Sequence, residues 1–63
     1  MVQNKLLQAS IDKYKAEISE ALATLDVYFN NPVGIGEHPD LLAEIDKYVE
    51  KLETATGKLE TLQ

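Results

Sequence analysis

Two arms of the sequence place apolar residues at alternating steps of four and three, and this rhythm restricts the chain to helices packed along a seam. A strand would need an alternation of period two, which neither arm contains. In heptad letters, Ile11 and Ile45 are a positions, and Leu7 and Leu41 are d positions. The a and d positions of the two arms are Leu7, Ile11, Tyr14, Ile18, Ala21, Leu25, Tyr28, Leu41, Ile45, Tyr48, Leu52, Ala55, Leu59 and Leu62.

The two arms are separated by a ten-residue segment, residues 30–39, that holds both prolines and two of the three glycines. Glycine permits a positive φ and proline cannot continue a helix, so this segment predicts a loop. We expect helices over residues 4–30 and 39–62 and a loop over 31–38. Asn30 or Asn31 would end the first helix in the left-handed conformation. Pro39 suits the first helical position of the second helix, with Asp40 in its first turn.

Residues 1–63 therefore predict a single all-α domain, an antiparallel two-helix hairpin with a heptad seam. Folding the arms antiparallel sets opposite each other those seam residues whose numbers add up to 69 or 70. Both seam alanines then face tyrosines, Ala21 opposite Tyr48 and Ala55 opposite Tyr14. Large against small keeps each layer of the core at a similar volume, which favours this pairing.

The hairpin is too small to be well stabilised by its own core. Burying the apolar surface of a compact 63-residue domain contributes about 90 kcal/mol, and ordering the chain costs about 95 kcal/mol. Small domains usually compensate with disulfides, metals or oligomerisation. The chain has no cysteine and one histidine, which excludes disulfides and leaves association as the remaining route.

A second apolar stripe lies beside the seam at the loop end. Its e-position residues are Leu22, Phe29, Leu42 and Val49, with Val27 and Ile35 nearby. A hairpin cannot cover such a surface alone, and exposed patches of this kind mark association. We expect two hairpins to pair there as a homodimeric four-helix bundle, and a protein partner still to be identified is the other occupant considered.

The charge balance bears on partners of other classes. Eleven acids against six lysines, with no arginine, give a net charge of −5. Nucleic acids and anionic membranes both bind through basic residues, so we expect neither as a partner. A nucleic-acid accessory using Lys5, Lys13, Lys15 and Lys58 ranks last among the hypotheses. The N-terminus is too polar for a signal peptide, which predicts a cytoplasmic protein.

The loop residues support one alternative function. Gly34 and Gly36 lack the Gly-Lys-Ser/Thr ending of a phosphate loop and are interpreted as turn residues. Glu37-His38-Pro39-Asp40 could make a small-ligand or metal-binding module, although a lone histidine has no second strong ligand in its own chain. We expect no cofactor and no metal. No catalytic constellation of Ser/His/Asp or Cys/His type is present, so we expect no enzyme.

The string Asn-Asn-Pro-Val-Gly-Ile-Gly-Glu-His-Pro-Asp, followed by a heptad helix, resembles short uncharacterised helical-hairpin proteins of marine tailed phages. The resemblance covers residues 25–62. It implies a phage accessory protein acting in the host cell cytoplasm, and it carries over no catalytic or ligand-binding residue.

Overall fold

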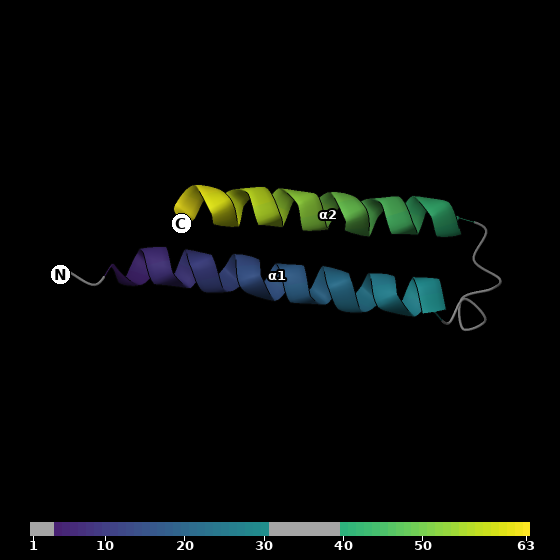
Figure 1. Ribbon diagram of the computed structural model, residues 1–63, viewed down its shortest axis with the longest axis horizontal. Helices are drawn as coiled ribbons and strands as arrows, with labels where there is room; N and C mark the ends of the chain where they lie inside the picture. Colours follow the sequence, from purple (N-terminus) through teal and green to yellow (C-terminus); the bar gives the residue numbers. More distant parts are fainter. Residues whose placement is uncertain (1–3, 31–39) are drawn as a thin grey trace.

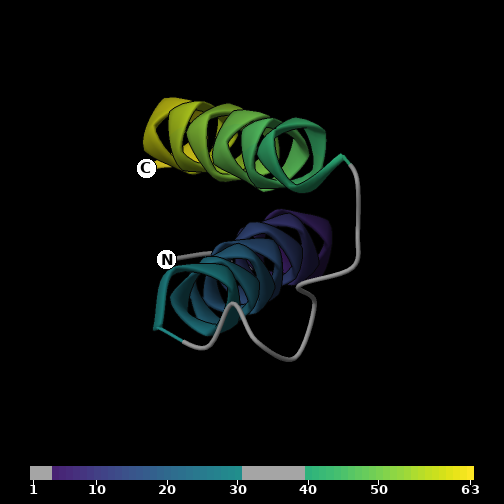
Figure 2. The same cartoon turned by 90° about the vertical axis from the view of Figure 1, so that its right-hand side faces the viewer.

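The computed structural model describes residues 4–30 and 40–63, which form two α-helices. Helix α1 spans Lys5–Asn30 and helix α2 spans Leu41–Leu62. The two helices lie side by side and run in opposite directions, so that the start of α1 and the end of α2 lie toward the same end of the molecule (Figure 1). The view from the other direction shows the same two-helix arrangement (Figure 2). The prediction of an all-α helical hairpin is confirmed.

The core of the hairpin lies along the predicted seam. Ala21, Ala55 and Leu25 are buried, with 0%, 1% and 7% of their surface exposed. The remaining a and d residues are half-buried, apart from Leu7 near the start of α1, which is exposed. Two of the three buried residues are alanines, so small side chains of the seam are covered completely by the opposite helix.

The seam is flanked unequally on its two sides. Every half-buried residue outside the a and d positions occupies a g position, one residue before an a position. These residues are Ser10, Glu17, Thr24, Glu44 and Lys51. The e positions on the opposite flank are all exposed. The helices therefore lean together on their g side and leave their e side open.

The side-chain contacts across the seam join residues whose numbers add up to slightly more than the 69 or 70 expected for facing a and d positions. The numbers add up to 71 for Glu20 and Lys51, to 72 for Tyr28 with Glu44 and for Tyr14 with Lys58, and to 76 for Tyr28 with Tyr48. Helical side chains lean toward the N-terminus of their own helix. A side chain therefore reaches a point beside a residue that has a lower number than its own. In an antiparallel pair this holds for both helices, so two side chains in contact have residue numbers with a higher sum than two Cα atoms that lie opposite each other.

The helix ends differ in detail from the predicted boundaries. The side-chain Oδ1 of Asn4 accepts a hydrogen bond from the backbone N–H of Leu7 at 3.0 Å, which caps α1. Asn30 stays helical, since no described non-glycine residue has a positive φ, and its Nδ2 donates back to Asp26. Asp40 takes the N-cap position of α2 instead of a place in its first turn.

The molecule is an elongated rod rather than a globule. Its principal extents are 52 × 15 × 13 Å. It exposes 4937 Å² of surface, whereas a compact protein of 7 kDa exposes about 4,000 Å². The hairpin therefore hides less surface than the compact domain assumed from its length.

Candidate interaction surface

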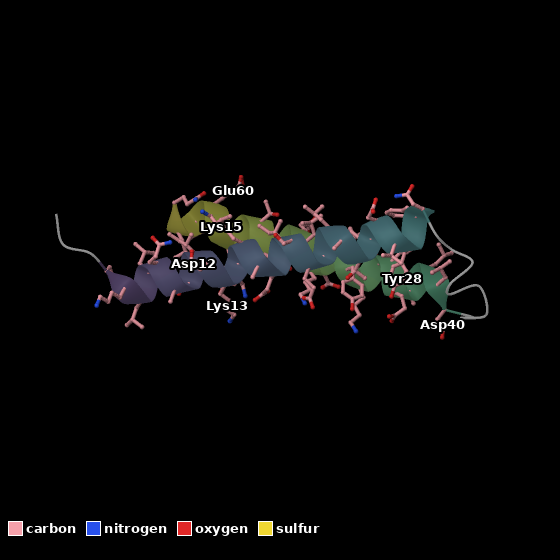
Figure 3. All side chains as sticks on the ribbon, turned by 90° about the horizontal axis from the view of Figure 1, so that it is seen from below. Asp12, Lys13, Lys15, Tyr28, Asp40 and Glu60 are labelled. Atoms are coloured by element: carbon pink, nitrogen blue, oxygen red, sulfur yellow. The ribbon has the colours of Figure 1, made fainter. Side chains whose placement is uncertain are left out.

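The hairpin has two faces that differ in chemistry, one on each flank of the seam. Glu20 pairs with Lys51, and Lys13 and Lys58 both lie over the ring of Tyr14, so the c and g positions of α1 and α2 share one face. We call this the lysine face. The e and b positions of both helices share the opposite face, which we call the patch face. Figure 3 shows Lys15 and Glu60 toward one edge of the molecule and Lys13 and Asp40 toward the other.

Four large apolar side chains lie together on the patch face near the loop end, and we call them the patch. Their exposed fractions are 52% for Leu22, 61% for Phe29, 82% for Leu42 and 44% for Val49. Leu22 and Val49, like Phe29 and Leu42, have numbers that add up to 71, the same sum as the contacting pair Glu20 and Lys51. Each patch pair therefore lies at one level of the hairpin, with one residue from each helix.

Val27 does not belong with the other predicted interface residues. It follows Glu20 by seven residues, so it lies on the lysine face, and it is 51% exposed. A step of 100° per residue separates it from Phe29 by 200° around α1. Nearness in sequence at the loop end was a poor guide, because two residues along a helix point to opposite sides. The other predicted residues, Gly34, Ile35, Gly36, Glu37 and His38, lie outside the described residues.

The patch face is also the acidic face. Its heptad positions carry two lysines, Lys5 and Lys15, against five acids, which are Asp12, Asp26, Asp46, Glu53 and Glu60. The lysine face balances four lysines against four acids, which are Lys13, Lys47, Lys51, Lys58, Glu17, Glu20, Asp40 and Glu44. The four lysines of the nucleic-acid hypothesis are split between the two faces, two on each.

The lysines of the lysine face are engaged with groups of the hairpin itself. The ammonium groups of Lys13 and Lys58 each lie 5.5 Å from the centre of the Tyr14 ring. Those of Lys47 and Lys51 lie 5.6 and 6.0 Å from the centre of the Tyr48 ring. The hydrogen bond to Glu20 raises the pKa of Lys51 above its ordinary value. The Lys58–Tyr14 contact and the ion pair with Glu20 connect the two helices along this face, and its lysines are already engaged within the hairpin.

A tyrosine cluster joins the loop ends of the helices. The Tyr28 hydroxyl donates to Oε1 of Glu44 at 3.4 Å, and the Tyr28 and Tyr48 rings meet edge to face with centres 6.0 Å apart. Burial, and then the negative charge of Glu44, raises the pKa of Tyr28. Sequence reasoning treated the tyrosines as seam residues and missed this cluster. The signal available was a carboxylate at a g position of the opposite helix.

The described residues offer little room for a small molecule. A shallow groove of about 230 Å³ lies at the chain-end half of the hairpin, lined by Ser10, Tyr14, Lys58, Thr61 and Leu62. Ligand pockets usually hold about 300–1,000 Å³. Within residues 4–30 and 40–63, no three His, Cys, Asp or Glu side chains are placed to hold a metal ion. The alternative that uses Glu37 and His38 concerns undescribed residues and stays a prediction.

Neither described helix is long and apolar enough to cross a bilayer. Comparison with known proteins finds no matching family model, no matching curated protein and no matching solved structure. The patch and the charges around it are therefore the features of the described residues that indicate a function.

Proposed function

We propose that this protein is a non-enzymatic interaction module, a helical hairpin that completes its apolar core by docking the patch against another helical surface. The observation that carries the proposal is the patch itself, four large apolar side chains on one face that are 44–82% exposed. Leaving that much apolar surface in water is unfavourable by roughly 25 cal/mol per Å². Covering it would make a three- or four-helix bundle, and a second copy is the occupant that the sequence predicts.

Two further observations support a docking role. The extended rod exposes more surface than a globule of its mass, so a partner would supply burial that the single chain lacks. The groove beside Tyr14 is shallow, which favours an interaction role over a substrate-processing one. A cytoplasmic site of action, in an infected host cell as the phage resemblance implies, is part of this proposal. It rests on the absence of cysteine from the sequence.

A pair of matched substitutions tests the proposal. Leu42 on the patch face and Leu6 on the lysine face are both 82% exposed, so replacing either by Asp should leave the isolated hairpin folded. Sedimentation velocity over a wide range of protein concentration reports association with a second copy. Titration with a helical peptide that carries leucines and lysines reports association with another helix.

We expect Leu42→Asp to abolish whichever association the wild type shows, and Leu6→Asp to preserve it. Circular dichroism checks that both variants remain helical. If Leu42→Asp and Leu6→Asp behave alike in both assays, the patch is not a docking surface and the proposal is wrong.

A further inference from the structure

The acids of the patch face are interleaved with the patch in the same way on both helices. Asp26 lies four residues after Leu22 and three before Phe29, and Asp46 lies four residues after Leu42 and three before Val49. Residues three and four apart are neighbours on a helix surface. Each helix therefore presents an apolar–acid–apolar row, and Asp26 and Asp46 are both exposed.

No lysine lies among the patch-face positions of this half of the hairpin. The nearest e-position lysine in α1 is Lys15, a full heptad before Leu22. The ion pair between Lys51 and Glu20 lies on the lysine face, away from both rows. The hydrogen bond that Asp26 accepts comes from the neutral amide of Asn30, at 2.6 Å, which leaves its negative charge in place. The rim of the patch is therefore acidic.

The patch is too small to form a stable interface alone, so the acidic residues around it must also contact the partner. If 150–250 Å² is taken for a large side chain and weighted by the exposed fractions, the four patch residues supply at most about 600 Å². A stable interface buries about 800 Å² on each partner. The missing area must come from the residues around the patch, so the partner has to accommodate Asp26 and Asp46.

A second copy is poorly suited to that rim. Stacking patch on patch would set Asp26 and Asp46 of one hairpin beside the same two residues of the other, with no base from either copy in that half. Carboxylates of like sign repel across an interface. Shifting one copy by half its length would bring Lys15 toward these acids, but it would place the patch over the polar e positions Gln8, Lys15, Thr56 and Gln63.

We infer that the patch, if it docks a partner as proposed above, takes a basic amphipathic helix of another protein in preference to a second copy of this chain. Leucine-like side chains of that helix, spaced three and four residues apart, would lie on the patch. Lysine or arginine side chains beside them would pair with Asp26 and Asp46. The inference rests on the proposed function and adds the chemistry of the partner.

Two synthetic peptides of about 18 residues, long enough for partial helix formation in water, provide the probes. Both carry leucines at helical spacing, and one carries lysines where its twin carries glutamates. Each is titrated into the full-length protein at low and at high salt, with binding followed by amide chemical shifts. We expect the lysine peptide to bind, the glutamate peptide not to bind, and salt to weaken binding because the pairs are exposed.

The double variant Asp26→Asn/Asp46→Asn, which removes the two negative charges and keeps the side-chain size, tests the rim directly. We expect it to bind the lysine peptide roughly two- to tenfold more weakly, the effect of losing two exposed ion pairs, and to self-associate more strongly because repulsion is removed. Glu17→Gln/Glu50→Gln changes the net charge equally at positions away from the patch face. This control should leave both properties close to those of the wild type.

Three outcomes would overturn the inference. The first is equal binding of the two peptides, and the second is an equal loss of binding in the rim variant and its control. The third is a patch-dependent dimer that the lysine peptide cannot dissociate, a result that supports the proposed function while rejecting the basic partner. Failure of the proposed function is a separate result, because Leu42→Asp and Leu6→Asp would then be indistinguishable.

Discussion

The three buried side chains show how narrow the core of this hairpin is. Ala21, Leu25 and Ala55 are the buried residues of the described part, and two of them have only a methyl group. Ala21 and Ala55 are 0% and 1% exposed, so a larger side chain at either position would have to displace its neighbours. Stability at the residue scale therefore depends on small side chains as well as on large ones.

Enlarging a seam alanine should destabilise the hairpin. We expect Ala21→Leu to lower the free energy of unfolding by about 1–3 kcal/mol through overpacking, measured by urea denaturation. Ala23→Leu makes the same change at an exposed position of α1 and should have a small effect. Equal effects of the two substitutions would mean that Ala21 is not confined by α2.

Tyr28 should make the hairpin sensitive to alkaline pH. Its pKa is raised in the folded state from the ordinary value of 10.0, so the folded chain holds the phenolic proton more tightly than the unfolded chain. The stability due to Tyr28 is complete below pH 10.0 and is lost as pH rises through the folded pKa. Lys51, raised from 10.5 by Glu20, acts in the same direction.

We expect thermal unfolding followed by circular dichroism to show a falling melting temperature above about pH 10, and a shallower fall in Tyr28→Phe. Tyr14→Phe removes a hydroxyl far from Glu44 and should keep the slope of the wild type. An unchanged slope in Tyr28→Phe would exclude this tyrosine as a source of the pH dependence.

At the scale of the elements, the two helices differ in how their N-termini are capped. Helix α1 begins at the side-chain cap of Asn4, whereas no side-chain hydrogen bond caps α2 at Asp40. Helix α2 also contains Gly57, an exposed residue near its C-terminal end. Helix α2 is therefore the element with more to gain from substitution.

Gly57→Ala should stabilise α2 by about 1 kcal/mol, since alanine has the higher helix propensity. A Cβ at this position would meet no atom within 4 Å, and φ is not positive there. The reciprocal change Ala43→Gly, at an exposed position of the same helix, should destabilise by a similar amount. Urea denaturation measures both, and equal signs would contradict the prediction.

At the scale of the whole molecule, the rod shape and the open patch face belong together. Two antiparallel helices have one seam, so each helix can bury only the side that faces its neighbour. The g flank is closed by the lysine–tyrosine contacts and the e flank is left to solvent. The unpartnered flank carries four of the seven exposed large apolar side chains of the described residues and most of the excess acid.

Small-angle X-ray scattering of the dilute protein should report a radius of gyration close to 15 Å, since the Cα atoms alone give 14.9 Å. A compact globule of this length would give about 11 Å and an unfolded chain about 24 Å. Leu42→Asp and Leu6→Asp should share the value of the dilute wild type. A result near either limit would show that the hairpin does not persist alone.

The sequence by itself determined the helices, the seam and the four patch residues, because a 3.5-residue repeat fixes which side of each helix is apolar. It also placed Ala21 and Ala55 in that seam. Only the tertiary structure decided toward which flank the helices lean, and hence that the g positions are half-buried while the e positions, with the patch, are exposed. It also decided that Lys51 meets Glu20 and that Tyr28 meets Glu44. Such contacts depend on how far one helix is displaced along the other, and the spacing of residues within a single helix does not determine that displacement.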